Sequence, residues 1–431
     1  MQTALGAIVV LTTSTMNRVM VVELALPAML PGLLVGLHYA VQLLRPRLGH
    51  GSDIGRRRTP WIVGGMAVLA LGGVGAAGGT ALMETHLTAG IVLALIAFMA
   101  IGVGVGSAGT SLLVLLAKQV APGRRPAAAT IVWLMMIAGF AVTATLAGGF
   151  LDPYSPERLI AVTATVSAAA FALSVLAIWG IENRAPAPDA AAGAPKPAFV
   201  EALSSVWREP VARRFTVFVF VSMLAYSAQD LILEPFAGTV FGMTPGESTR
   251  LAGLQHGGVF VGMILVAIVG SLARGRRLGS LRAWTIGGCI ASAAALILVG
   301  AGGLMAETWP LKATVFALGA ANGAFAVAAI GSMMELVSQG GGGREGVRMG
   351  LWGAAQAIAF GLGGFIGTLA IDAVRALIAA PEIAYAIVFT AEGLTFLVAA
   401  LLAARIARES LAASRARSLP PGVSVADASM G

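Results

Sequence analysis

Apolar runs of about 20 residues recur along this chain from its first residues to about residue 406. A helix needs about 20 apolar residues to cross a bilayer, and only helices and closed barrels satisfy their own backbone polar groups in lipid. Of the 431 residues, 58% are hydrophobic and 11% are charged, whereas a soluble domain is about 25% charged. The sequence therefore predicts an all-α polytopic membrane protein.

Twelve membrane spans are expected, in two groups of six separated by a segment of different composition. The spans run over 3–24, 31–50, 60–83, 89–117, 126–150, 158–181, 213–236, 250–272, 281–304, 310–337, 347–371 and 383–406. This divides the chain into a six-helix bundle at 1–181, a linker at 182–212, a second six-helix bundle at 213–406 and a polar, disordered tail at 407–431.

The linker is rich in proline and alanine, a composition typical of connecting segments. Four of its apolar residues fall on one helical face: Val200, Leu203, Val206 and Trp207. They indicate either a short helix lying on the membrane surface or a plain loop.

Basic residues predict the orientation, because cytoplasmic loops carry an excess of lysine and arginine. Most of the 28 lysines and arginines fall on the side that holds both termini. We therefore expect a multi-pass membrane protein with both termini in the cytoplasm. The single cysteine, Cys289, excludes a disulfide within the chain and a cysteine-based metal site, and no free metal ion is expected.

The two groups of spans match at an offset of 218–220 residues, as expected of an internal repeat. The matched pairs are His38 with His256, Trp133 with Trp352, Asp152 with Asp372, Arg56 with Arg274 and Arg58 with Arg276. Two six-helix units joined by a long central loop resemble the plan of the major facilitator superfamily.

The loop between the second and third spans supports this resemblance. It reads L-G-H-G-S-D-I-G-R-R-R-T-P over 48–60 and is similar to the superfamily's G-x-x-x-D-x-x-G-R-R/K signature. The matching residues are Gly49, Asp53, Gly55, Arg56 and Arg57, although one residue separates Asp53 from Gly55 where the signature has two. The resemblance implies a gating loop, and the other interpretation is basic anchoring of a cytoplasmic loop.

Ionisable residues inside spans are costly and mark candidate functional sites. His38 and His256 occupy equivalent places in the two bundles, about 10 Å from the outer ends of their spans. A neutral imidazole nitrogen can be an axial ligand of a metal, including the magnesium of a chlorin, or it can bond a neighbouring helix.

The other candidates are charged. Arg18, Glu23, Asp230 and Glu234 lie near the outer ends of the first and seventh spans, where an ion pair between Arg18 and Asp230 is expected, or else charges that reach the interface. Arg45 and Arg47 are candidates to bind a carboxylate or a lipid phosphate, or they flank the span as basic anchors. Glu392, in the middle of the last span, is a candidate contact for a partner helix or pigment, or a protonated carboxyl bonded internally.

Three segments carry a resemblance to a narrower family: N-R-V-M-V-V-E-L at 17–24, R-R-T-P-W-I at 57–62 and A-Y-S-A-Q-D-L-I-L-E-P-F at 225–236, with L-Q-H-G-G-V at 254–259. They resemble the PucC/LhaA family of major-facilitator-like proteins from photosynthetic bacteria, and within it the branch called bacteriochlorophyll synthase chain. The resemblance implies a role in bacteriochlorophyll supply or light-harvesting complex assembly, with antenna polypeptides or pigment-synthesis enzymes as partners.

Two functions follow from these observations. The first is a factor that binds bacteriochlorophyll, with a carotenoid as an open second pigment, and hands it to those partners. The second is a secondary transporter of a tetrapyrrole or another amphipathic molecule. An enzyme is not expected, because a prenyltransferase that attaches the pigment tail needs aspartate-rich Mg-diphosphate sites, and neither D-x-x-x-D nor D-x-x-D occurs.

Overall fold

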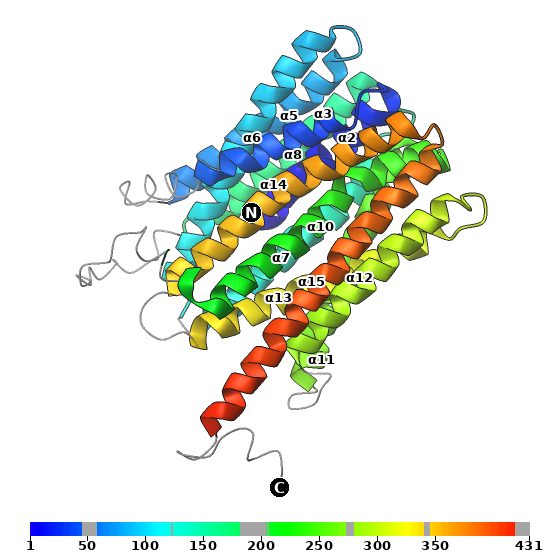
Figure 1. The fold of residues 1–431 in the computed structure, drawn as a ribbon. Coiled ribbons are helices and arrows are strands. Elements are labelled where there is room, and N and C mark those ends of the chain that lie inside the picture. The colour runs from blue at the N-terminus through cyan, green and yellow to red at the C-terminus, as the bar shows by residue number, and fades with distance from the viewer. Residues whose placement is uncertain are drawn as a thin grey trace.

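The computed structural model describes residues 1–44, 58–121, 124–181, 204, 207–272, 280–339 and 345–418. Within these ranges the chain is helical, and its long helices run side by side (Figure 1). Eleven segments are long and apolar enough to cross a membrane. The segment Met29–Leu44, where the second span was predicted, is a shorter apolar helix.

The first span, Gln2–Glu23, is a continuous helix that contains two π-turns. Its parts are α1 (Gln2–Val10), the π-turn η1 (Leu11–Thr15), α2 (Met16–Arg18) and a second π-turn η2 (Val19–Glu23). A π-turn inserts a residue into the helical ladder and is frequent at functional sites. This span is also almost entirely buried, which places it at the centre of the bundle.

We call the helices from α1 to α8 the N-half and those from α10 to α15 the C-half. The rest of the N-half comprises α3 (Met29–Val41), the 3-10 turn η3 (Gln42–Leu44), α5 (Thr59–Leu82), α6 (Leu87–Gln119), α7 (Arg125–Gly148) and α8 (Pro156–Ile178). The C-half comprises α10 (Pro210–Phe241), α11 (Pro245–Leu272), α12 (Leu281–Gly303), α13 (Leu311–Gln339), α14 (Glu345–Leu377) and α15 (Pro381–Ser418).

Proline and glycine set many helix ends. Proline stands in the first turn of α5, α7, α8 and α10, where its missing N–H has no helical partner to lose. Gly242 ends α10 in the left-handed region, with φ of 65°, as is common just after a helix. These signals are visible in the sequence, and they explain why the predicted and observed ends lie close together.

The two halves meet along two helix pairs. In one pair α7 packs on α11, and in the other α14 packs on α3. Small residues allow close approach: a Cβ added at Gly148 would lie 2.6 Å from the Gly246 carbonyl oxygen. At the repeat offset α3 corresponds to α11 and α7 to α14, so the two pairs are equivalent by the predicted duplication.

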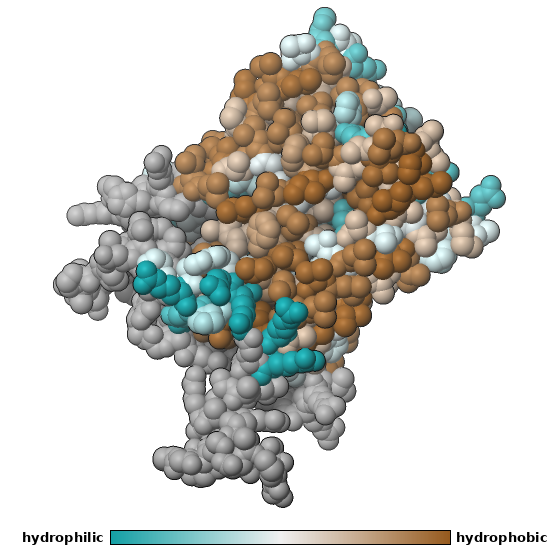
Figure 2. Space-filling view, viewed as in Figure 1, coloured by the Kyte–Doolittle hydropathy of each residue, from teal (hydrophilic) through white to brown (hydrophobic). Residues whose placement is uncertain are grey.

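The surface is apolar over most of the face seen in Figure 2, with polar residues toward its ends. Large apolar side chains stand outward on several helices, among them Leu71, Leu146, Leu176, Trp179 and Leu401. Such exposure is what a bilayer requires of a spanning bundle. The chain is therefore a multi-pass membrane protein.

The C-terminal end differs from the sequence-based prediction. Helix α15 continues to Ser418, so residues 407–418 of the predicted disordered tail are helical. The segment is rich in alanine and arginine, which are strong helix formers. Most of the predicted linker, including Val200, Leu203 and Val206, lies outside the described residues, and the domain boundaries stay a prediction.

Candidate functional site: the junction between the halves

A buried carboxylate joins three helices at the centre of the bundle. Glu234 of α10 is 1% exposed and accepts a hydrogen bond from Ser14 of η1. It also lies 3.1 Å from Ser248 Oγ and 3.4 Å from Thr249 Oγ1, both on α11. The carboxylate therefore connects the N-half to the C-half through hydroxyl donors.

Two further bonds continue this contact along the first span. Thr15 Oγ1 lies 3.0 Å from Thr249 Oγ1, and Asn17 donates to the Leu231 carbonyl of α10. Ser14, Thr15 and Asn17 are three of several polar residues in this span. Their bonds to the C-half explain why they are tolerated, because an unsatisfied polar group in this place would be costly.

Arg18 is 2% exposed and binds across the junction in a different way from the one predicted. It forms an ion pair with Glu23, and its Nη2 donates to the Met243 carbonyl at 2.6 Å. The predicted ion pair with Asp230 is wrong: Asp230 accepts instead from Gln255 Nε2, at 3.4 Å. Glu23 follows Arg18 by five residues. The hydrogen bonds of a π-turn such as η2 join residues that are separated by the same number.

Glycine makes room for the guanidinium. A Cβ at Gly238 of α10 would lie 3.0 Å from Nη2 and 3.1 Å from Nε of Arg18. Of the four residues predicted to form a charge group between the bundles, Arg18, Glu23 and Glu234 lie together, and Asp230 lies one helical turn before Glu234 on α10.

Two aspartates bind helix N-termini across the junction. Asp152, in the connection between α7 and α8, accepts from the Gly246 N–H at 3.0 Å and from Thr244 Oγ1 at 2.8 Å. Asp372 of α14 accepts from the N–H groups of Ala28 and Met29, at 3.0 and 2.7 Å. The sequence matched these aspartates in the repeat but gave no sign of their partners.

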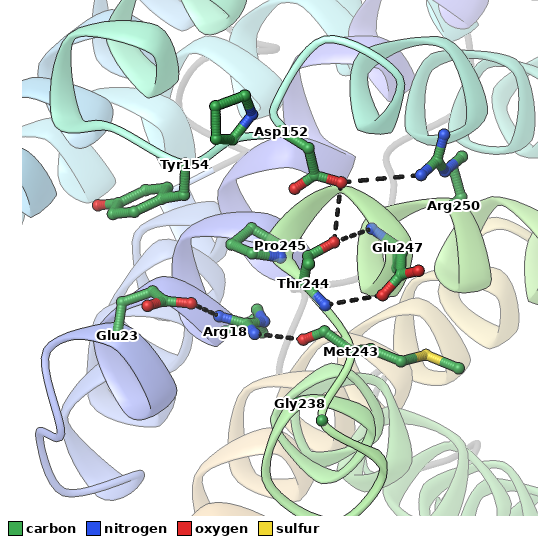
Figure 3. A pocket seen from close by; sticks show the side chains of 12 residues that line it. Arg18, Glu23, Asp152, Tyr154, Gly238, Met243, Thr244, Pro245, Glu247 and Arg250 are labelled. Atoms are coloured by element: carbon green, nitrogen blue, oxygen red, sulfur yellow. Dashed lines mark hydrogen bonds and ion pairs between the residues drawn. The ribbon is translucent and has the colours of Figure 1, made fainter.

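A pocket of about 600 Å³ opens beside Arg18 and Asp152 (Figure 3). Both halves line it, with Arg18, Asp152 and Tyr154 on one side and Thr244 and Arg250 on the other. Burial, with a smaller contribution from the charge of Glu84, raises the pKa of Tyr154 to about 12. The pocket therefore combines charges of both signs with a phenol that stays neutral at physiological pH.

The paired histidines occupy equivalent positions on α3 and α11, and both are buried. His38 of α3 is 2% exposed, and its Nε2 lies 2.8 Å from the donor Nε2 of Gln42. His256 of α11 is 8% exposed and packs against Phe140 of α7, with 4.9 Å between ring centroids. The corresponding contact of α3 with α14 pairs Tyr39 with Phe360, at 5.5 Å.

A magnesium chlorin does not fit these histidines in the conformation described. The ligand must offer a nitrogen lone pair beneath an open face of the macrocycle. The bond from Gln42 occupies Nε2 of His38, and Phe140 lies against the ring of His256. Ligation by His38 and His256 stays a prediction, and it requires the Gln42 bond and the Phe140 contact to be released.

Glu392 of α15 faces inward. It is 7% exposed, and neither carboxylate oxygen has a hydrogen-bond partner among the described residues. The carboxylate lies against α14, where a Cβ added at Gly367 would lie 3.2 Å from Glu392 Oε1. The side chain therefore does not face a partner helix or pigment on the outer surface of α15, contrary to the first interpretation, and no hydrogen bond among the described residues supports the internally bonded carboxyl of the second.

The remaining predicted site residues lie outside the described part of the chain. They are the two candidate anion-binding residues and the gating loop: Arg45, Arg47, Gly49, Asp53, Gly55, Arg56 and Arg57.

Sequence comparison decides the family. The family profile described as PUCC protein matches residues 15–411, nearly the whole chain and every part of the junction from Thr15 onward. The chain belongs to the PUCC family. The relationship predicted from the segments at 17–24 and 225–236 is confirmed.

Two relatives show how far this similarity extends. The chain is 52% identical over 404 residues to the "Bacteriochlorophyll synthase 44.5 kDa chain" of Rhodobacter capsulatus, covering 93% of this chain and 92% of the relative. It is 30% identical over 389 residues to "Protein PucC" of Rhodovulum sulfidophilum, covering 87% and 84%.

Among solved structures, this PUCC-family chain is similar to a bacterial homologue of the human lysosomal transporter Spinster, crystallised in an inward-facing, unoccupied conformation. The TM-score is 0.65 with 15% sequence identity, covering 96% of this chain and 95% of that one. The likeness concerns the fold, and it confirms the predicted major-facilitator architecture.

Proposed function

We propose that this chain handles bacteriochlorophyll: it binds the pigment within the membrane and delivers it for bacteriochlorophyll biosynthesis and light-harvesting complex assembly. The observation that carries the proposal is the 52% identity, over 93% of the chain, to a protein named for bacteriochlorophyll synthesis. The acceptors are light-harvesting antenna polypeptides or pigment-synthesis enzymes.

The bundle offers a setting for such a role. The junction contains buried polar groups from both halves, and its helices meet through small residues that let their backbones approach closely. The outer surface is apolar and suited to an amphipathic pigment that moves within the bilayer. Because both paired histidines are covered, pigment would bind His256 only after the Phe140 contact with α7 opens, and His38 only after the Gln42 bond is released.

The proposal includes no catalytic step. The family and the transporter-like fold support a non-enzymatic role, although one relative is called a synthase. We further propose the bacterial inner membrane as the location, with both termini in the cytoplasm, on the distribution of lysine and arginine.

Purification from pigment-containing membranes tests the proposal. We expect the protein to carry bound bacteriochlorophyll in its absorption spectrum and to retain antenna or pigment-synthesis polypeptides. A colourless protein without such partners, purified in a mild detergent that leaves antenna complexes intact, would contradict it. The His38→Ala/His256→Ala double variant tests the ligand prediction separately, since unchanged pigment content would exclude both histidines.

A second function is favoured by the fold alone. Similarity over 96% of the chain to a transporter's structure supports a secondary transporter of a tetrapyrrole or another amphipathic molecule. Flux of pigment across reconstituted vesicles, driven by an ion gradient, would favour transport, whereas saturable binding without flux would favour delivery.

A further inference from the structure

One end of the bundle carries two equivalent carboxylate contacts between the halves. We call it the Asp152 face; it holds Ala28, Asp152, Thr244 and Asp372, where the odd-numbered spans end. Asp152 of the N-half binds the start of α11 in the C-half, and Asp372 of the C-half binds the start of α3 in the N-half. Each half therefore contributes one carboxylate and receives the other.

The sequence repeat relates the two contacts. Asp152 and Asp372 differ by 220 residues, and their backbone partners Ala28 and Gly246 differ by 218. The offset of 218 also pairs His38 with His256. Two similar contacts at symmetry-related places, each made by an aspartate, indicate a feature of the duplicated unit rather than two separate surface interactions.

The hydrogen bonds from backbone N–H groups to the Asp152 and Asp372 carboxylates are charge-assisted, which makes them strong. Free N–H groups in the first turn of a helix concentrate positive charge, and a carboxylate placed there is stabilised. The Ala28 N-cap of α3 provides no side-chain cap, so Asp372 supplies the acceptor that the helix lacks. Without it, the Ala28 and Met29 N–H groups would lose their carboxylate partner.

At α11 the local chain caps itself and still leaves a donor for the other half. Thr244 Oγ1 accepts from the Glu247 N–H at 3.2 Å, and Glu247 Oε2 accepts from the Thr244 N–H at 3.0 Å, which is a capping box. The Gly246 N–H remains for Asp152. A Cβ at Gly246 would overlap the Asp152 carboxylate, so this close approach requires glycine.

We propose that Asp152 and Asp372 form a symmetry-related pair of latches that hold the Asp152 face closed. Opening this face separates each carboxylate from a helix N-terminus of the opposite half. The Glu234 and Arg18 contacts close the same end from within the junction. Access to the space between the halves from the Asp152 face then requires both latches to release.

Distances between spin labels test the proposal without pigment, so its failure is distinct from failure of the proposed function. Labels are placed on Thr85→Cys and Glu307→Cys, in exposed connections of the N-half and C-half at this end, in a Cys289→Ala background. We expect one short-distance population in the otherwise native chain. Asp152→Asn and Asp372→Asn should each raise the open-to-closed ratio about tenfold, and the double variant about a hundredfold.

The control is Glu157→Gln, which removes an exposed carboxylate in the first turn of α8 at the same end and should leave the distances unchanged. Thr244→Ala removes one donor to Asp152 without changing either carboxylate, and it should give part of the Asp152→Asn shift. An unchanged distance distribution in Asp372→Asn, or an equal shift in Glu157→Gln, would overturn the proposal.

Discussion

Removing the Glu234 carboxylate should show which hydroxyl depends on it most. Glu234→Ala deprives Ser14, Ser248 and Thr249 of a shared acceptor at the centre of the junction. The three hydroxyls are not equivalent. Ser248 Oγ also lies 3.2 Å from the Pro245 carbonyl, and Thr249 Oγ1 lies 3.0 Å from Thr15 Oγ1, whereas Ser14 makes no second bond to another residue in the described structure.

The magnitude follows from this difference. A hydrogen bond to a charged group contributes about 1.5–3 kcal/mol, and a buried donor left without a partner costs about 1–3 kcal/mol. We therefore expect Glu234→Ala to lower the free energy of unfolding by about 3–5 kcal/mol. The coupling energy of Glu234 with Ser14 should be about 1–2 kcal/mol, and that with Ser248 about 0.5 kcal/mol or less.

Two double-mutant cycles measure these couplings: Glu234→Ala with Ser14→Ala, and Glu234→Ala with Ser248→Ala. Each needs the free energy of unfolding of four variants in the same detergent or bilayer, for example by steric trapping with bound streptavidin. The Ser248 cycle is the matched control, because both serines donate to the same carboxylate. Equal couplings in the two cycles, or no coupling to Ser14, would refute the reasoning.

Three further predictions concern packing, pH and a second ion pair. Alanine at Gly65 would place its Cβ 2.7 Å from the Ala108 backbone nitrogen, whereas a Cβ at Gly64 would meet open space. Thermal unfolding should therefore show the Gly65→Ala variant to be less stable than the Gly64→Ala variant by about 1–3 kcal/mol. Equal stabilities would contradict this packing. Because the pKa of Tyr154 is raised to about 12, its stabilising contribution is complete below about pH 10 and is lost as the pH rises toward 12. Unfolding measured from pH 9 to 12 should show this loss in the native chain and less of it in Tyr154→Phe. Arg348→Ala breaks an ion pair with Glu209, 2.5 Å between Nη2 and Oε2, and should destabilise the chain by about 1–3 kcal/mol, with partial recovery when the two charges are exchanged.

Much of the fold was predictable because the helices follow from the apolar composition of the spans and from proline and glycine near their ends. Apolar runs, first-turn prolines and the glycine after α10 fix where helices begin and end, independently of tertiary contacts. The exception among the described residues is the end of α15, which extends to Ser418 because helix-forming residues continue past the apolar stretch.

The side-chain partners were less predictable. The expected approach of the outer ends of the first and seventh spans paired Arg18 with Asp230, but Arg18 binds Glu23 and the Met243 carbonyl instead. The first span contains two π-turns, and no sequence pattern announces such a turn. The latches are hidden for a different reason: Asp152 and Asp372 match in the repeat, but their partners are backbone N–H groups of helices more than 90 residues away, and any residue type supplies those.

Glu392 shows the same limit. A carboxylate in the last span suggested a contact with something outside the bundle, since the twelfth helix is peripheral in this fold. On a helix that is apolar on all sides, the sequence does not show which face turns inward. The packing of the neighbouring helices decides it. Here α14 offers Gly367, and the space that glycine leaves is filled by the carboxylate.

The most direct test of pigment handling is a titration of the purified protein, in lipid nanodiscs, with bacteriochlorophyll. Quenching of its seven tryptophans would report binding, with empty nanodiscs and a metal-free pigment as controls. The account predicts saturation at a fixed ratio of pigment to protein, above partitioning into the lipid. A signal that rises linearly with pigment, as it does in nanodiscs containing an unrelated membrane protein, would contradict it.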